Sequence, residues 1–355
     1  MAEGGESMIK MIKQISLMLI SAGLLLILGG FASVDFDVYK LSTVIDEEVV
    51  YRTKTIPLDE IRKLAVSVSY SDLVIETSPT DDFVITYPES ESLQYSLKMT
   101  ANWVGLEKKP VLKLMNWFTI TDREDTVVTI QVPKAFQGVL AVQGSHGDAQ
   151  IKDLHSLSMF TIDYEYGDCW LTSIDAESVS FRFAHGKSYL ENFQSRSLSI
   201  KDEYMESEYD TLKVNSELSF TSSHSSVVMS NSEAVSLITD FNYSSLTIED
   251  STFEEQVNII MAHEDAKIKT TFMDGLYLAG KYVNLQLQDN DVQSIYVDLR
   301  HGDVEGTLKG AEDEYSTNAV VTHGDANISS QYREGAKYEL DLMLDYSNAK
   351  LAFAK

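Results

Sequence analysis

Residues 179–187 read VSFRFAHGK, residues 295–303 read IYVDLRHGD and residues 340–348 read LDLMLDYSN. In each stretch, apolar side chains stand two, four and six residues before a histidine or tyrosine, and mostly polar residues fill the positions between. Alternation with a period of two is the pattern of a strand with one buried face. A turn-forming dipeptide follows the ring residue, so each stretch predicts a strand that ends at a corner.

The ring residue recurs along most of the chain, and from His146 onward successive rings are 19 to 23 residues apart. A repeat with a fixed period in this range indicates stacked structural units. An earlier copy of the pattern, LAVSVSYSDLVIE, lies around residue 70. The ring residues, which we treat as repeat anchors, are Tyr70, His146, Tyr166, His185, Tyr204, His224, Tyr243, His263, Tyr282, His301, His323 and Tyr346.

Apolar or small residues follow each anchor at three and five positions, for example Cys169 and Leu171 after Tyr166. This odd offset requires a corner or bulge if both strands are to face the same interior. One unit is then strand, corner, strand and turn, with a contour of about 65 Å. We predict an all-β fold, a single-stranded β-solenoid (β-helix) with coils of about 20 residues. Propeller blades or a meandering sandwich are the alternatives, although blades need about 40 residues.

The spacing between Tyr70 and His146 is far longer than one period. We interpret residues 83–137 as an excursion or cap, because the end of a solenoid exposes a sheet edge. The segments FTIT and TVVTIQV predict a hairpin around residues 122–125. Trp103 and Trp117 lie in this region, and the alternative to a cap is a contact surface that uses these two aromatic side chains.

The N-terminal part predicts the location of the protein. Residues 1–14 form a short cytoplasmic N-terminus, residues 15–33 an uncharged transmembrane helix or signal anchor, residues 34–59 a juxtamembrane linker and residues 60–355 the β-solenoid. Lysines before the apolar run and acids after it predict a single-pass protein of the cell membrane whose solenoid lies outside the cell. The alternative is a secreted protein after signal cleavage. Translation starts at Met1 or Met8.

Composition and motifs say little about chemistry. The formal net charge of −27 opposes binding of nucleic acid. The chain has no nucleophile elbow, P-loop or zinc-protease motif. The anchors predict a stack of rings at the end of the inward face, and burial of the histidines there predicts a loss of stability below about pH 6. Histidines on alternate coils are too far apart to share a metal ion, and only His301 and His323 would lie on neighbouring coils. We therefore predict no metal site and no cofactor.

The corner motifs HGDAQIKD, YGDCWLTS, RHGDVEG and THGDANIS, with the apolar N-terminal run, resemble the bacterial "putative adhesin" family of β-strand-repeat proteins, the LiaG-like group of Gram-positive bacteria. The resemblance covers about residues 60–355. It implies the solenoid fold and an extracellular location, and some members lie in gene neighbourhoods linked to cell-envelope stress. The family has no catalytic residues to carry over.

We therefore expect a membrane-anchored, surface-exposed protein that is not an enzyme and acts in binding, adhesion or scaffolding of the envelope. The second hypothesis is an accessory component of envelope-stress sensing, which binds a membrane partner through the anchor or through residues 83–137. A glycan-acting enzyme is the third. The expected partners are the membrane, reached by the N-terminal helix, and either an envelope membrane protein or a surface ligand. Fold alone decides between none of these.

Overall fold

The computed structural model describes residues 16, 18–27, 29, 32, 48–91, 93–110 and 126–354. The chain divides into two units. In the first, residues 18–27 are helical; within the described residues, no helix has both the length and the apolar character needed to cross a membrane. The second unit comprises residues 51–88, 95–109 and 126–355, and its described part is almost entirely β-structure.

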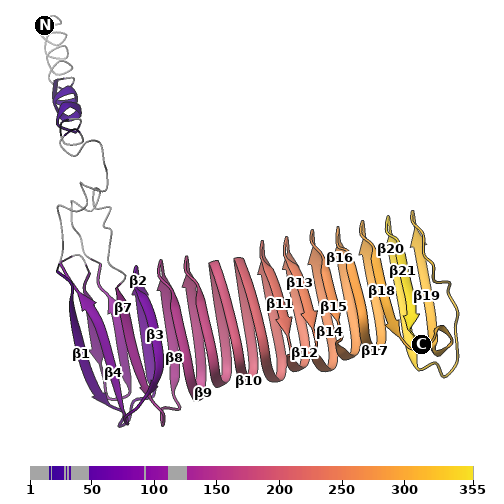
Figure 1. Cartoon of the computed structure of the whole chain (residues 1–355), viewed down its shortest axis with the longest axis horizontal. Helices are drawn as coiled ribbons and strands as arrows, with labels where there is room; N and C mark the ends of the chain where they lie inside the picture. The colour runs from indigo at the N-terminus through magenta and orange to yellow at the C-terminus, as the bar shows by residue number, and fades with distance from the viewer. Residues whose placement is uncertain are drawn as a thin grey trace, which may run out of the picture. The chain divides into compact units, whose positions relative to one another are not determined.

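Strands of the second unit stack as the coils of a β-solenoid (Figure 1), which confirms the predicted fold. The strands are β1 (Val50–Pro57), β2 (Lys63–Ser69), β3 (Asp72–Ser78), β4 (Asp82–Glu89), β5 (Tyr95–Met99), β6 (Trp103–Lys108), β7 (Val127–Pro133), β8 (Val139–Ser145), β9 (Ala149–Glu165), β10 (Cys169–Ser223), β11 (Ser226–Ser230), β12 (Glu233–Asn242), β13 (Ser245–Glu249), β14 (Thr252–Ala262), β15 (Ala266–Lys269), β16 (Phe272–Lys281), β17 (Leu285–Arg300), β18 (Val304–Lys309), β19 (Tyr315–Thr322), β20 (Tyr338–Asp345) and β21 (Ala349–Ala354), with one 3₁₀ turn at Glu312–Glu314.

Two parallel sheets meet at the anchors. Segments before an anchor form sheet A, which includes β2, β8, the second half of β9, β12, β14, β16 and β20. Segments after an anchor form sheet B, which includes β3, β11, β13, β15, β18 and β21. The predicted inward positions line the core: Phe181 and Phe183 before His185 are buried, and so are Cys169 and Leu171 after Tyr166.

Every anchor has a left-handed backbone, with φ between 51° and 66°. This single αL residue provides the corner that the odd offset requires. A left-handed conformation costs a non-glycine residue about 1–2 kcal/mol, and two interactions offset that cost here. The anchor N–H donates to a carbonyl of the next coil, as from Tyr166 to Ala184 at 2.8 Å, and the anchor ring stacks on its neighbours. A second left-handed corner lies seven residues after eight of the anchors, for example at Asn192.

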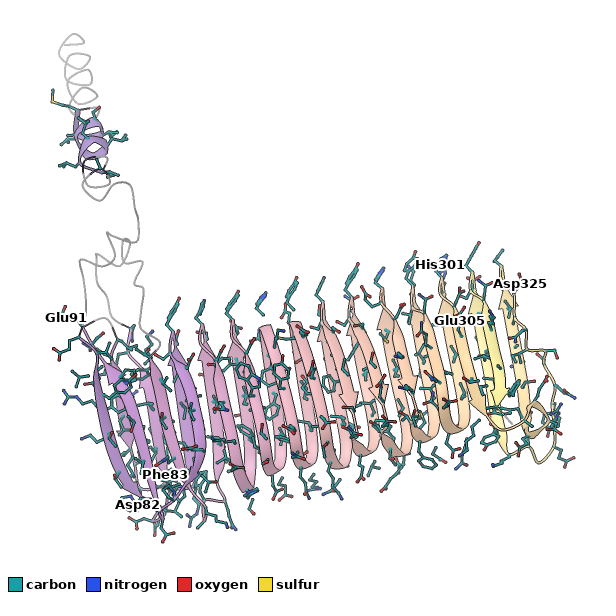
Figure 2. The ribbon with its side chains drawn as sticks, in the orientation of Figure 1. Asp82, Phe83, Glu91, His301, Glu305 and Asp325 are labelled. Atoms are coloured by element: carbon teal, nitrogen blue, oxygen red, sulfur yellow. The ribbon has the colours of Figure 1, made fainter. Side chains whose placement is uncertain are left out.

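The twelve anchor rings form one continuous stack, with centroids 4.3–5.1 Å apart and ring planes within 26° of parallel. We call it the ring ladder; it is about 50 Å long. The expected inward position is wrong. The ladder lies along an outer edge of the solenoid, where His301 projects from its corner (Figure 2), and the tyrosine rungs are about half exposed. The predicted acid instability through buried histidines therefore loses its structural basis.

The last two coils are interleaved. β20 pairs with β17 on one side and with β19 on the other, so β19 is the outermost strand of sheet A although it precedes β20 in sequence (Figure 1). The ladder consequently runs from His301 to Tyr346 and only then to His323. With this order, tyrosine and histidine alternate without exception over all twelve rungs. Our expectation that His301 and His323 lie on neighbouring coils is wrong, because the ring of Tyr346 separates them.

The coils before and after the long interval between Tyr70 and His146 are direct neighbours in the stack. β2 pairs in parallel with β8, and the rings of Tyr70 and His146 stack at 4.5 Å. Within residues 83–137, β6 extends sheet A beyond β2, and β5 pairs with β6 in the antiparallel sense. β7 extends sheet B beyond β3 and pairs antiparallel with β4. FTIT and the predicted hairpin turn lie outside the described residues.

Candidate functional site

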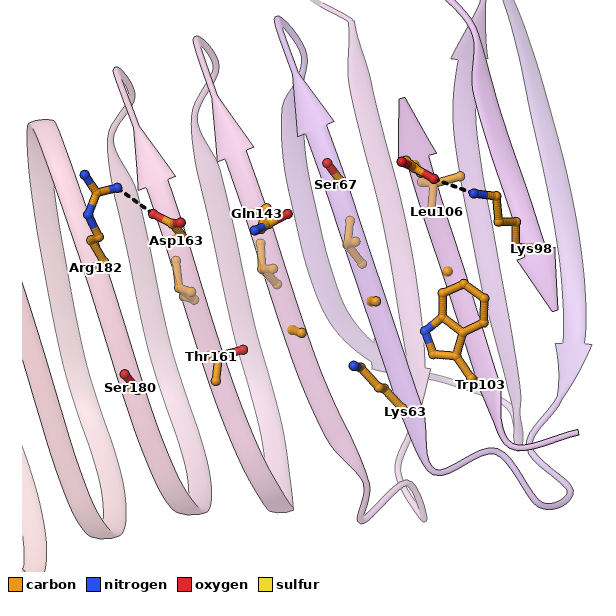
Figure 3. Close-up of a pocket in the computed structure, with 17 residues that line it drawn as sticks. Lys63, Ser67, Lys98, Trp103, Leu106, Gln143, Thr161, Asp163, Ser180 and Arg182 are labelled. Carbon is orange, nitrogen blue, oxygen red and sulfur yellow. Dashed lines mark hydrogen bonds and ion pairs between the residues drawn. The ribbon is translucent and has the colours of Figure 1, made fainter. Parts of the chain in front are cut away.

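A shallow groove of about 560 Å³ crosses the outer face of sheet A near its N-terminal end. Its lining comes from β5, β6, β2, β8, β9 and β10, which are neighbours in the sheet. Because the groove crosses these strands, its long direction follows the stacking direction of the coils (Figure 3). The side chains that line it stand at the outward positions of these strands, which alternate with the buried core positions.

Small residues form the floor of the groove. One outward position on each of five adjacent strands carries a side chain no larger than threonine, and the strand register aligns these positions in a row. At about 4.8 Å per strand, the row is about 19 Å long. Larger residues at these positions would fill the space. The row consists of Gly105, Ala65, Ala141, Thr161 and Ser180.

The side chain of Trp103 lies flat on its own strand at one end of this floor. A Cβ atom on Gly105 would come within 2.3 Å of the indole Cζ2 and 2.8 Å of Cη2, so glycine is required for the ring to lie there. The ring turns its other face outward (Figure 3). Trp103 is half-buried, and Lys63 on β2 is its register partner. The structure thus presents a flat aromatic surface next to a flat floor.

Polar side chains follow one long side of the groove. The order across the strands is Glu107, Ser67, Gln143, Asp163 and Arg182. Ion pairs hold both ends of this row. Lys98 Nζ lies 2.7 Å from Glu107 Oε2, and Arg182 Nη1 lies 2.8 Å from Asp163 Oδ1 and 2.6 Å from Glu165 Oε1.

The charges of the groove are nearly balanced. Three cationic side chains, Lys63, Lys98 and Arg182, and two carboxylates, Glu107 and Asp163, line it. Hydrogen bonds with Glu165 and Asp163 raise the pKa of Arg182 above its ordinary value. The guanidinium and the carboxylates remain partly exposed, so their free donors and acceptors stay within reach of a ligand.

The spacing of the two groove carboxylates does not suit glycoside hydrolysis. Glu107 and Asp163 stand on strands that are three strand intervals apart, which corresponds to about 14 Å. Catalytic carboxylate pairs in most glycosidases are about 5–9.5 Å apart. Each of the two is also ion-paired with a neighbouring cation. Glu107 and Asp163 therefore do not form an acid and base pair of the glycosidase type.

The histidine anchors do not gather into a metal site. A tyrosine ring lies between each histidine and the next in the ladder, and no group of three His, Cys, Asp or Glu side chains suitable for a metal ion occurs among the described residues. The aspartates that follow some anchors have a structural role. Asp148 Oδ1 accepts the backbone N–H of Asp168 at 3.0 Å, and Asp168 Oδ1 accepts that of Lys187 at 2.8 Å.

One buried polar cluster in the core is not predicted by the repeat pattern. Asp202 occupies an inward position two residues before Tyr204 and is only 1% exposed. Its Oδ2 accepts hydrogen bonds from Ser207 Oγ at 2.7 Å and Tyr209 Oη at 2.9 Å. Its Oδ1 has no hydrogen-bond partner in the described structure. Burial raises the pKa of Asp202 to about 6, although the two hydrogen bonds act in the opposite direction. An acid at a position that is apolar in most coils was the available signal.

Two tryptophans are the predicted contact residues. Trp103 lies in the groove, whereas Trp117 falls outside the described residues. The other groove residues were not singled out in the sequence, because small residues at outward positions carry no motif. Their common register is visible only once β6 and β8 are placed on either side of β2.

Comparisons with known proteins give one family match and several similar solved structures. The family model described as Toastrack DUF4097 matches residues 61–222, which include the whole groove. No curated protein matches the chain.

The solved structures that are similar to it include the following three. A putative adhesin from Bacteroides fragilis has 13% identity, covers 73% of this chain and 97% of its own, and gives a TM-score of 0.39. A putative lipid binding protein from Parabacteroides distasonis has 13% identity, 72% and 96% coverage and a TM-score of 0.38. A putative cell adhesion protein from Clostridium sporogenes has 10% identity, 86% and 100% coverage and a TM-score of 0.19.

Proposed function

We propose that the part of the chain that matches the Toastrack DUF4097 family model, residues 61–222, acts as a non-catalytic, adhesin-like binding module that holds an extended ligand in the groove of sheet A. The observation that carries the proposal is the row of small residues from Gly105 to Ser180, which continues in register from the outward face of Trp103. A flat open surface with one aromatic platform suits an extended ligand better than a compact one.

A rigid floor supports a binding role. The floor strands have neighbours on both sides in sheet A, and the side chains beneath them, including Leu64, Val66, Leu140 and Val142, are at most 2% exposed. A surface built on a packed core loses little conformational freedom when a ligand binds. The separated, ion-paired carboxylates support a role without catalysis.

The proposal places the groove outside the cell, on a chain anchored by residues 15–33. Leu19, Leu25 and Leu26 are exposed in the helical segment, and exposed apolar side chains of this density favour a lipid or protein environment. The uncharged run with lysines before it and acids after it favours a cytoplasmic N-terminus. The same features leave room for the second hypothesis, an accessory component in envelope-stress sensing that binds a membrane partner.

Cosedimentation of the detergent-solubilised full chain with a panel of polymers tests the proposal. The panel contains neutral polysaccharides, acidic polysaccharides, extended polypeptides and lipid vesicles. Trp103→Ala removes the aromatic platform, and Trp170→Ala is the matched control, because Trp170 stacks on Tyr189 outside the groove. We expect at least one polymer to bind to the wild type and to Trp170→Ala but not to Trp103→Ala. Equal binding by all three proteins, or no binding by any, would contradict the proposed function.

A further inference from the structure

We infer that the ligand of the groove is a neutral linear glycan that lies along the stacking direction, with one sugar ring on the indole of Trp103 and the chain passing over Ala65 and Ala141. This inference rests on the proposed function and names its ligand. It follows from the flat floor, the arrangement of polar groups beside it and the balance of charge.

The shape and polarity of the groove match a pyranose polymer. A sugar ring has apolar C–H faces and a polar hydroxyl edge. The outward indole face and the small-residue floor present an apolar surface to such a face. Gln143, Asp163 and Arg182 lie along the adjoining side, where planar amide, carboxylate and guanidinium groups can donate to and accept from hydroxyl groups.

The charge distribution selects against a polyanion. The chain carries a formal net charge of −27, which repels an acidic polymer at long range. Within the groove, Lys98 is paired with Glu107, and Arg182 is paired with Asp163 and Glu165. These pairs leave Lys63 as the groove cation for which no ion pair occurs within the described residues. One cation at one end does not provide the repeated contacts that a charged polymer needs.

The backbone of the groove selects against an extended peptide. Peptides that bind a sheet as an added strand need an unpaired strand edge. β6, β2, β8 and β9 are each paired on both sides in sheet A, so these floor strands have no free row of N–H and C=O groups. A peptide on this face would leave its own amides without partners from the floor. A glycan has no backbone amides, and its hydroxyl groups can instead reach the polar row beside the floor.

Isothermal titration calorimetry of the full chain with linear hexasaccharides tests the inference. The neutral probes are cellohexaose, mannohexaose and chitohexaose, and the acidic probe is hexagalacturonate. Ala141→Leu raises the floor at its centre without changing the core. Ala279→Leu is the matched control, because Ala279 is the register partner of outward Asp298 on the same sheet, away from the groove.

We expect a neutral probe to bind, with affinity reduced about tenfold or more by Trp103→Ala and by Ala141→Leu and unchanged by Ala279→Leu. Because no net charge is involved, affinity should change less than about twofold between about 0.05 and 0.5 M NaCl. Binding of hexagalacturonate alone, or of none of the four probes, would overturn the inference. If Trp103→Ala abolishes binding of another polymer in the cosedimentation panel, the proposed binding function stands and only the neutral glycan is ruled out. If it abolishes binding of no polymer, the proposed function and the inferred ligand are both wrong.

Discussion

Replacing the buried acid by its amide, Asp202→Asn, should stabilise the fold at neutral pH. Asp202 is 1% exposed, and its pKa is about 6 in the fold against an ordinary value of 3.8. Below pH 3.8 the group is protonated in both folded and unfolded chains, so it imposes no penalty. Between about pH 3.8 and pH 6 the unfolded chain ionises while the desolvated carboxyl of the folded chain stays protonated, so stability falls by about 3 kcal/mol and then remains constant at higher pH.

The amide avoids this ionisation and keeps an oxygen that can accept from Ser207 Oγ and Tyr209 Oη. Its NH₂ group takes the place of Oδ1, which has no hydrogen-bond partner in the described structure, and this unmet donor costs about 1 kcal/mol. We therefore expect Asp202→Asn to be about 2 kcal/mol more stable than the wild type at pH 8. At pH 4 the difference should vanish or reverse slightly.

Guanidinium unfolding of both proteins at pH 4, 5, 6, 7 and 8 measures the difference directly. Titration of all other carboxylates affects both proteins equally and cancels. Asp298→Asn, at an exposed position, is the control for the loss of one surface carboxylate. A difference for Asp202→Asn that stays constant from pH 4 to pH 8, or a loss of stability at pH 8, would refute the reasoning.

Three other features give predictions. Tyr243→Ala removes two ring contacts of the ladder and should cost about 1–3 kcal/mol in thermal unfolding. His323→Ala at the terminal rung removes one ring contact and a solvent-exposed contact of 3.3 Å with Asp345, and should cost less; equal costs would argue against stacking as a source of stability. Gly167→Ala would place a Cβ 1.9 Å from the backbone carbonyl oxygen of Gly147 in the preceding coil and should prevent normal folding, judged by circular dichroism. The nearest atom to a Cβ at Gly275 is a serine hydroxyl at 3.1 Å, so Gly275→Ala should fold. Cys169 is fully buried, and burial raises its pKa well above the ordinary value, so a thiol reagent should label it only after denaturation; rapid labelling of the folded protein would contradict this.

The solenoid could be predicted because its periodicity is local. Alternation before each anchor and the odd offset after it determine which side chains face inward, and residues such as Val297 and Leu299 are buried as expected. The position of the anchor rings was wrong for a specific reason. Continuing the inward alternation to the anchor ignores that a left-handed residue redirects its side chain, and φ is near +58° at His301.

The order of the last coils and the groove depend on pairing between distant segments. No pattern in residues 301–346 predicts that β20 inserts between β17 and β19. The longer anchor spacings of 22 and 23 residues indicate only that the repeat is irregular there. The floor of the groove joins Gly105, Ala65 and Ala141 from strands separated by tens of residues. A tryptophan in the interrupted region was the part of the site that sequence could indicate.

A crystal structure of the chain with a bound neutral hexasaccharide would show whether the groove of sheet A is the binding site. We predict a sugar ring parallel to the indole of Trp103, with the chain continuing over Ala65 and Ala141 beside the polar row that ends at Arg182. A ligand bound along the ring ladder or on sheet B, with the groove empty, would contradict the account.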